Sequence, residues 1–346
     1  MILPLHPQEG ATVSLQSEAQ RAFLADEPRR RAMDGNLTFR WYDLEREEKD
    51  STQPLPVLFS WEESLSEGEE EAKGALYCLL VSESPDMTDA AVYMTEEKRL
   101  AVYNLKVATA YFWCVQKNGR RSAVFSFTTL ATLPRCVRID AISNVRDMGG
   151  YEVEGGRIRQ GLLYRGGEFE LHGHLTKQGA EALCRLGIRT ELDMRGEAIG
   201  KVDFTAAEPL GISRILVPCV PYTQVFKKEN AANVGAFFKV LAEPSHYPVY
   251  FHCWGGADRT GTFALILGAF FGMGEAQLID DYEFTSLSVW GTRTRNYGEF
   301  RRFWEAFMAL SGDTLRQKAD AFLRDIAGLS LAQREALYRI LVEPNM

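Results

Sequence analysis

The feature that most constrains the fold of this chain is a change of pattern near Pro134. Before it, short segments rich in β-branched and aromatic residues are separated by turn-like stretches, which is typical of a β-sandwich. Beyond it, strand-like segments alternate with helix-like ones, which predicts an α/β domain with a central, largely parallel sheet flanked by helices. We therefore expect two domains, an all-β sandwich over residues 1–134 and an α/β domain over residues 135–346, and the length of 346 residues is enough for both.

The N-terminal part carries at least five strand-like segments. They are residues 57–61, 75–81, 100–103, 110–115 and 122–128. Between them, the stretches 84–86 and 117–119 have the composition of turns. This style of sequence resembles a fibronectin type III or immunoglobulin-like module, with Trp61 in its core. Residues 17–31 are charged and helix-prone, and the acidic run 67–71 is interpreted as a solvated loop.

The C-terminal part alternates between strands and helices. Strand-like segments cover residues 187–193, 212–217 and 248–251, and helix-like segments cover residues 176–186, 231–241 and 261–272. From Gly274 to Leu341 the pattern is mostly helical. This order predicts strands joined by helical crossovers in one sheet.

Charge and hydropathy narrow the class of partner. The formal net charge of −8 argues against a dedicated nucleic-acid binder, because binding to a phosphate backbone needs a basic surface. About −7 of this charge falls before residue 135, which makes the C-terminal part the better candidate for binding an anionic substrate. No stretch approaches the roughly 18 apolar residues of a membrane span.

The 6 cysteines are scattered without CxxC spacing, so they favour neither a zinc site nor a disulfide framework. Most of them lie in apolar strings, and we expect those outside the segment described next to be buried thiols. The N-terminus has no basic region followed by an apolar run, so no signal peptide is evident. We therefore expect a reducing, cytoplasmic location, with an N-terminal leader removed earlier as the open alternative.

The segment that says most about chemistry is Val249–Gly261, with the sequence VYFHCWGGADRTG. A short apolar strand leads to Cys253, Gly255 and Gly256 permit tight turns, and an apolar helix follows. A loop that closes onto a helix N-terminus directs several backbone N–H groups and the positive end of the helix dipole at one point. That geometry suits a phosphate and lowers the pKa of a thiol. Arg259 can hold a phosphoryl group with two parallel hydrogen bonds.

On these residues the chain resembles the cysteine-based protein tyrosine phosphatase superfamily, whose signature is His-Cys-x5-Arg-Ser/Thr. The likeness is strongest to bacterial tyrosine and dual-specificity phosphatases with loops of the form HCxxGKDRTG. Further segments that carry it are residues 144–151, 161–167, 192–197 and 280–285. The resemblance covers about residues 135–341. It implies hydrolysis of phosphate monoesters through a phosphocysteine intermediate, with neither a metal nor another cofactor.

The resemblance also implies a role for each residue of the loop. Cys253 is expected to be the nucleophile and Arg259 the phosphate clamp. The residues expected around the phosphate are Trp254, Gly255, Gly256, Ala257, Asp258 and Arg259. His252 is expected to orient the loop and tune the thiolate, with an ordinary core histidine as the alternative. Thr260 can donate a hydrogen bond to the sulfur as it leaves, or serve only as a helix cap.

Two aspartates compete for the role of general acid. Asp258 lies within the loop, where the resembling enzymes place their acid. Asp193 ends a predicted strand, and active sites of α/β proteins form at such ends. We favour Asp258. Arg165 and Arg195 either line the pocket or are structural, and Asp147 is expected to hold an arginine.

Ala257 stands where many of the resembling loops have lysine. That lysine adds positive charge suited to multiply phosphorylated ligands, so its absence favours phosphotyrosine in peptides or proteins as the substrate. A phosphoinositide or inositol phosphate is the first alternative. A pseudophosphatase that binds phosphorylated ligands without hydrolysis is the second, although the intact loop counts against it. A sulfurtransferase is more distant, because its cysteine loop does not require the Asp-Arg-Thr-Gly ending. The N-terminal sandwich is expected to pack on the catalytic domain or to recruit a partner by strand addition.

Overall fold

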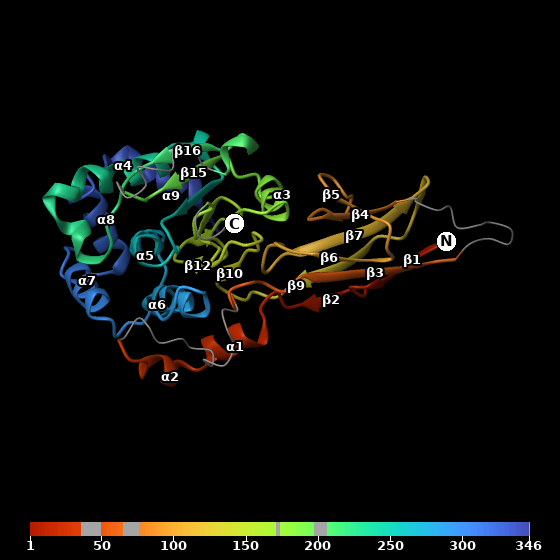
Figure 1. Ribbon diagram of the computed structural model, residues 1–346, viewed down its shortest axis with the longest axis horizontal. Helices are drawn as coiled ribbons and strands as arrows, with labels where there is room; N and C mark the ends of the chain where they lie inside the picture. The colour runs from red at the N-terminus through yellow and green to blue at the C-terminus, as the bar shows by residue number, and fades with distance from the viewer. Residues whose placement is uncertain (36–49, 65–75, 171–173, 197–205, 346) are drawn as a thin grey trace. The chain divides into compact units, whose positions relative to one another are not determined.

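The computed structural model describes residues 1–35, 50–64, 76–170, 174–196 and 206–345 (Figure 1). The chain divides into two compact units, each of which is described by itself. The first unit consists of Met1–Ser17 and Pro54–Leu133, and the second of Glu18–Gln53 and Pro134–Met346. The chain therefore passes between the units three times.

The first unit, as far as it is described, is built from strands. They are β1 (Ile2–His6), β2 (Ala11–Val13), β3 (Val57–Glu63), β4 (Tyr77–Ser82), β5 (Ala91–Thr95), β6 (Arg99–Val102), β7 (Ala110–Lys117), β8 (Arg120–Arg121) and β9 (Phe125–Thr129). One sheet has the order β1-β3-β6, and the other has the order β2-β9-β7-β4-β5 with β8 beside β7. β2 runs parallel to β9, and the other pairs are antiparallel.

Alternation along β3 explains how the two sheets share one core. Phe59 and Trp61 are buried, whereas Leu58, directly before Phe59, is 66% exposed, because successive side chains of a strand point to opposite faces. Phe59 lies edge-on against Trp113 of β7, with ring centroids 5.1 Å apart. The prediction that Trp61 belongs to this core is confirmed.

The five strands predicted in this unit correspond to β3, β4, β6, β7 and β9. The apolar pattern predicts no strand at β1, β2, β5 or β8. In β5 no residue is buried, so this strand lacks a clear apolar pattern. The acidic run 67–71 lies outside the described residues.

The second unit contains a mixed sheet whose larger part is parallel. Its strands are β10 (Arg135–Cys136), β11 (Arg146–Asp147), β14 (Leu163–Gly166), β17 (Val249–His252), β15 (Thr190–Asp193) and β16 (Ser213–Leu216), in this spatial order. The last four are parallel, as the alternation of strands and helices predicts. The first two join antiparallel to β14 and are too short to leave a sequence pattern. A small antiparallel sheet holds β12 (Glu152–Val153), β13 (Gly156–Ile158) and β18 (Val342–Pro344).

Helices flank this sheet (Figure 1). They are α1 (Glu18–Ala25), α2 (Glu27–Arg31), α3 (Lys177–Arg185), α4 (Ala231–Leu241), α5 (Asp258–Phe271), α6 (Glu275–Phe284), α7 (Gly298–Met308), α8 (Leu315–Asp325) and α9 (Leu331–Leu341). Local capping fixes several starts: the Thr314 hydroxyl accepts a hydrogen bond from the N–H of Gln317 at the start of α8. Among the described residues, no helix is both long enough and apolar enough to cross a membrane.

The central strand β17 is covered on both faces. Tyr250 stacks on Phe169, with ring centroids 4.7 Å apart, in the core that also holds α3. Phe251 points the other way and meets Phe237 of α4 at 5.6 Å. His252 then falls on the face of Tyr250, again beside Phe169. This double cover makes β17 a rigid support for the loop that follows it.

Residues 18–53 belong to the second unit, although the expected boundary at Pro134 had placed them in the N-terminal domain. The helix-prone stretch does form α1 and α2. Phe23 of α1 is fully buried in a cluster with Cys136, Phe284 and Leu287 of the second unit. Composition predicted the helices, but the surface that buries Phe23 comes from residues more than 100 positions away and leaves no local signal.

Candidate active site

Cys253 lies directly after β17, at the carboxyl end of the parallel sheet. The neighbouring strands end beside it, because Gly166 of β14 and Asp193 of β15 both pair with His252. The loop of residues 253–257 leads into α5, which begins at Asp258. Ligand sites of open α/β sheets form at this edge, so the topology places the predicted loop where a substrate can reach it.

Buried donors hold the loop by its backbone carbonyls. The Nδ2 of Asn144 donates to the carbonyl oxygens of Gly255 and Gly256, both at 3.0 Å. The Nη2 of Arg165 donates to the oxygen of Gly256 at 2.8 Å. Since the C=O and N–H of a trans peptide point in opposite directions, carbonyls held by the core leave the N–H groups facing the other way, as an anion-binding loop requires.

Gly256 is needed for this shape. Its φ is +65°, in the left-handed region that favours glycine. A Cβ atom at this position would lie 2.3 Å from the carbonyl oxygen of Gly166 on β14. The loop therefore approaches the sheet more closely than any side chain allows.

Two buried arginines and one aspartate support Asn144 from below. Arg146 donates to the Oδ1 of Asn144 and, through Nε, to Asp281 of α6 at 2.9 Å. Arg165 pairs with the other carboxylate oxygen of Asp281 at 2.6 Å. Burial alone would raise the pKa of Asp281, but the two guanidinium groups outweigh it and lower the pKa. Arg165 is fully buried, so it shapes the loop and does not line the pocket.

The environment of Cys253 favours a thiolate. The residue is only 4% exposed, and burial by itself would raise the pKa of the thiol. The charge of Arg259 and hydrogen bonds from the hydroxyl and backbone N–H of Thr260 outweigh burial and lower the pKa. The Nη1 of Arg259 donates to the carbonyl of Met194 at 3.2 Å, which anchors the partly exposed guanidinium beside the loop.

His252 is buried beneath the loop and connects its backbone to Glu191 through hydrogen bonds. Its Nδ1 lies 2.8 Å from the carbonyl oxygen of Cys253, and its Nε2 lies 2.8 Å from Oε1 of Glu191. Burial alone would lower the pKa of His252, but the hydrogen bond to Glu191 and the charges of Asp193 and Glu191 raise it to about 9. Near neutral pH the ring is therefore an imidazolium that donates from both nitrogens.

Asp193 is fully buried and bound on both of its oxygens. It accepts hydrogen bonds from Nε and Nη2 of Arg195, both at 2.9 Å, and from Nη2 of Arg214 at 2.7 Å. Burial would raise the pKa of Asp193, but the charges of His252 and Arg195 lower it to about 2. Asp193 therefore has no proton to donate near neutral pH, which argues against its candidacy as the general acid.

Arg195 is also committed to structure. Its guanidinium pairs with Asp193, Glu168 and Glu170, and it is fully buried. The Cζ atom of Arg195 lies 5.2 Å from the ring centroid of Trp254, so this cation–π contact also supports the loop. Asp147 holds Arg135, as expected, and also accepts hydrogen bonds from two backbone N–H groups.

Glu191, Asp193 and His252 bring three ligand-type atoms within 4.8 Å of one another, although the sequence shows no cluster with metal spacing. Their chemistry does not suit a metal ion. Both oxygens of Asp193 already accept hydrogen bonds from arginines, and the Nε2 of His252 already lies in hydrogen-bond contact with Glu191. The cluster is better understood as a charged frame beneath the loop.

Asp258, in the first turn of α5, is positioned by two residues far away in the sequence. Its Oδ1 accepts hydrogen bonds from the hydroxyl of Tyr222 at 2.5 Å and from Nε of Arg293 at 2.8 Å. Its Oδ2 accepts one from Nη2 of Arg293, also at 2.8 Å. The carboxyl group is 34% exposed, so it is held in place and still accessible to solvent.

Comparison with known proteins agrees with this geometry. Residues 137–343 match the profile of the "Tyrosine phosphatase family". The chain belongs to this family. A relative from Cupriavidus necator, named "Putative tyrosine-protein phosphatase H16_A0669", is 31% identical over an alignment of 172 residues, and the match covers 41% of this chain and 60% of the relative. The chain thus spans about 60% of the length of this curated family member.

Two solved structures show weaker likeness. The core catalytic domain of the PP-IP phosphatase SIW14 from S. cerevisiae has a TM-score of 0.31 and 12% identity, over 45% of this chain and 85% of that one. A human fibronectin type III domain from the KIAA0970 protein has a TM-score of 0.20 and 23% identity, over 36% of this chain and 93% of that one. TM-scores this low carry no conclusion about fold or substrate.

The family signature explains which site residues could be found from sequence. Cys253, His252, Arg259 and Thr260 are adjacent or nearly so, and the structure brings them together. Tyr222 and Arg293 were missed, because nothing in their local sequence links them to Asp258. A tyrosine with a φ of +51° is unusual, but such a conformation is visible only in the structure.

Proposed function

We propose that this member of the tyrosine phosphatase family is a phosphomonoester hydrolase that acts through Cys253, with phosphotyrosine in peptides or proteins as its leading substrate. The observation that carries the proposal is a buried thiol whose pKa is lowered, in a loop whose Gly255 and Gly256 carbonyls are turned into the core. A bound phosphate would meet the N–H groups of the loop, the positive end of α5 and Arg259.

In the first step, the thiolate of Cys253 attacks phosphorus, the S–P bond forms and the bond to the leaving oxygen breaks. The leaving oxygen takes a proton from the carboxylic acid of Asp258. The ion pair with Arg293 and the hydrogen bond from Tyr222 hold this carboxyl group in place for the step.

In the second step, Asp258 is a carboxylate and takes a proton from the water that attacks phosphorus. The S–P bond breaks, inorganic phosphate forms and Cys253 returns to the thiolate. Thr260 stabilises the departing sulfur, because its hydroxyl and N–H favour the charged form of this atom. The charged frame of His252, Glu191 and Asp193 is assigned to orienting the loop, with no proton transfer of its own.

The decisive experiment compares the wild type with Cys253→Ser. Phosphate release from a phosphotyrosine peptide is measured with chelator and reductant present. We expect activity in the wild type and none above background in the variant, because a hydroxyl in this site is a far weaker nucleophile than a thiolate. Activity that persists in Cys253→Ser would contradict the mechanism.

A substrate panel separates the remaining alternatives. It contains phosphotyrosine, phosphoserine and phosphothreonine peptides, a phosphoinositide and an inositol phosphate. A higher kcat/KM on the phosphoinositide than on the phosphotyrosine peptide would replace the proposed substrate and leave the mechanism in place. Binding of the peptide without phosphate release would indicate a pseudophosphatase.

For the first unit we propose a fibronectin type III-like sandwich with a structural or partner-binding role. The support is its two facing sheets around one core that contains Phe59, Trp61 and Trp113. Strand addition at a sheet edge is one way in which such a sandwich binds a peptide. Isothermal titration of the whole protein with a candidate peptide tests the binding role.

A further inference from the structure

Arg293 donates hydrogen bonds to both carboxylate oxygens of Asp258. It lies in the segment between α6 and α7, at a position outside any helix or strand. On its N-terminal side, the hydroxyl of Ser286 bonds both the N–H and the carbonyl of Arg293, at 2.9 and 2.8 Å. On its C-terminal side, the anchors come from Arg295 and Asn296. What fixes those two residues therefore also fixes the carboxyl of Asp258.

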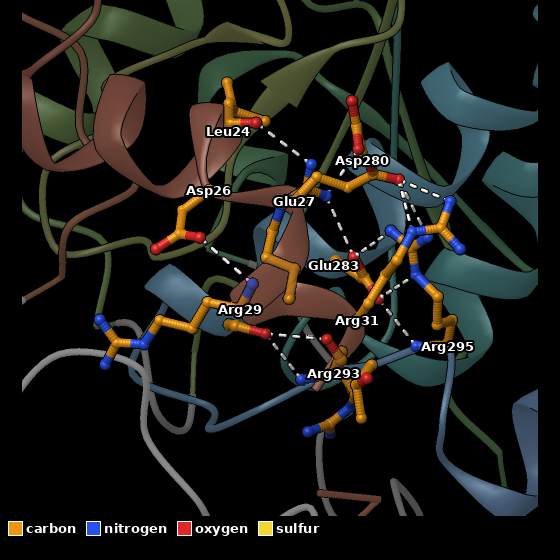
Figure 2. A network of polar contacts seen from close by, with 12 residues as sticks. Leu24, Asp26, Glu27, Arg29, Arg31, Asp280, Glu283, Arg293 and Arg295 are labelled. Carbon is orange, nitrogen blue, oxygen red and sulfur yellow. Dashed lines mark hydrogen bonds and ion pairs between the residues drawn. The ribbon is translucent and has the colours of Figure 1, made fainter. Parts of the chain in front are cut away.

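Glu283 is the first anchor. It lies at the end of α6, is fully buried, and accepts hydrogen bonds from Nε and Nη2 of Arg295, both at 2.8 Å, and from the backbone N–H of Arg295 at 3.0 Å. Its second oxygen also accepts from Nη1 of Arg30 on α2, at 3.0 Å, and the same Nη1 donates to Asp280 at 2.6 Å. Figure 2 shows Glu283 near the centre of a network of polar contacts that includes Asp280, Arg295 and residues of α2.

Asn296 is the second anchor. Its Nδ2 donates to the carbonyl oxygens of Arg31 and Met33, at 2.8 and 2.7 Å, at the C-terminal end of α2. The chain just beyond, at Gly35, runs so close that a Cβ atom there would lie 2.7 Å from the carbonyl oxygen of Asn296. Arg295 and Asn296 are thus held by α2 and by the glutamate that α2 helps to neutralise.

On the α2 side, the residues that make these contacts lie outside the part of the chain that matches the family, residues 137–343, whereas their partners lie inside it. We propose that residues 18–35 are a positioning element for proton transfer. Arg30, through Glu283 and Arg295, sets the position of Arg293 and with it the carboxyl of Asp258. The proposal rests on the proposed role of Asp258 as general acid. Arg30 and Arg293 are positioning residues, because neither is expected to touch the substrate.

Proton transfer gives this idea a specific signature. A carboxyl group must lie within hydrogen-bond reach of the leaving oxygen, and a displacement of about 1 Å can lower the rate roughly 100-fold. The effect is greatest when the leaving group is a poor one, because an acidic leaving group departs without a proton. A purely structural role for Arg30 would lower stability and leave the dependence of rate on the leaving group unchanged.

The test uses the whole protein and two substrates, phenyl phosphate and p-nitrophenyl phosphate, whose leaving groups differ in pKa. In Arg30→Met we expect kcat/KM to fall about tenfold on phenyl phosphate and less than about twofold on p-nitrophenyl phosphate. The matched control is Arg324→Met on α8, outside the proposed positioning element, where the arginine side chain is 49% exposed and pairs with the neighbouring Asp325. We expect Arg324→Met to match the wild type on both substrates.

A double-mutant cycle then shows whether Arg30 acts through Asp258. Asp258→Asn alone should lose more kcat/KM on phenyl phosphate than on p-nitrophenyl phosphate. Adding Arg30→Met to Asp258→Asn should lower kcat/KM on phenyl phosphate by less than about a further twofold. If Asp258→Asn loses no more kcat/KM on phenyl phosphate than on p-nitrophenyl phosphate, the proposed role of Asp258 fails. If Asp258→Asn shows this selective loss and Arg30→Met does not, only the positioning role of Arg30 fails.

Loss of fold in Arg30→Met would not end the test. Asn296→Ala removes only the two bonds to the carbonyls of α2 and should keep the circular dichroism spectrum of the wild type. We expect the same selective loss on phenyl phosphate. Equal losses on the two substrates, or none, in a folded Asn296→Ala would overturn the proposal.

Discussion

The protonated state of His252 makes a quantitative prediction about stability. The folded environment raises the pKa of this residue from 6.5 to about 9, mainly because Glu191 and Asp193 outweigh the effect of burial. A shift of this size, at 1.36 kcal/mol for each pKa unit, corresponds to about 3 kcal/mol of differential stabilisation. That is a large fraction of the 5–15 kcal/mol by which domains are usually stable, so about 3 kcal/mol is measurable.

The sign follows from the direction of the shift. Because the pKa is raised on folding, the native state binds the proton more tightly than the unfolded chain. The stabilisation is fully present below pH 6.5 and is lost as the pH rises through about 9. Cys253 works in the opposite direction in this window, because its pKa is lowered on folding. The experiment is therefore made in Cys253→Ser, which removes the thiol titration.

The assay is the free energy of unfolding in urea, at about pH 6 and about pH 9.5, for Cys253→Ser and for Cys253→Ser with His252→Gln. Groups that titrate elsewhere contribute equally to both proteins and cancel. We expect Cys253→Ser to lose about 3 kcal/mol more between the two pH values than the double variant. An equal loss in the two proteins would refute the interpretation of His252 as a buried imidazolium that brackets the loop.

Three further substitutions test the frame of the site. Gly256→Ala should destabilise the protein by at least about 1–2 kcal/mol and abolish most activity, whereas Gly155→Ala, also at positive φ but with no atom within 4 Å of the added Cβ, should lose stability alone. Asp193→Asn should lower the free energy of unfolding by about 3–5 kcal/mol, because it leaves buried arginines with less compensating charge, without changing the leaving-group dependence of kcat/KM. Asn144→Ala should lower kcat/KM about tenfold on both aryl phosphates alike, because the loss lies in the phosphate-binding loop and not in proton transfer. A steeper leaving-group dependence in Asp193→Asn would return that residue to consideration as the acid.

The domain arrangement affects how the catalytic part can be isolated. A truncation at Pro134, the boundary that the sequence favours, removes α1 and α2 together with the sandwich. It also uncovers the apolar surface of Cys136, Phe284 and Leu287 that Phe23 covers. Loss of activity in such a fragment would therefore say nothing about the sandwich itself.

The centre of the site was predictable because its information is local. The apolar strand before Cys253, the glycines and the apolar helix after Gly261 are contiguous, and strand, turn and helix preferences act over a few residues. The residues proposed as nucleophile, phosphate clamp and sulfur-stabilising hydroxyl all fall within eight positions, Cys253–Thr260. A pattern of this length also carries the family resemblance that the match over residues 137–343 confirms.

Competition between the two aspartates could not be settled in the same way. Both Asp193 and Asp258 lie at positions where a sequence permits catalysis. Their difference is electrostatic: Asp193 is enclosed by arginines and has a pKa of about 2, whereas Asp258 remains partly exposed. The groups that create this difference, among them Arg214 and Arg293, are 21 and 35 residues away from their partners.

By itself, the sequence determined the strand–loop–helix that carries Cys253, the order of strands and helices around it, and the helical character of residues 17–31. Only the tertiary structure decided which unit those helices join, which of the two aspartates is fully buried among arginines and which stays partly exposed, and that Arg30 and Arg293 belong to one network. The physical reason is range: backbone preferences act between neighbours in sequence, whereas burial and charge act between neighbours in space.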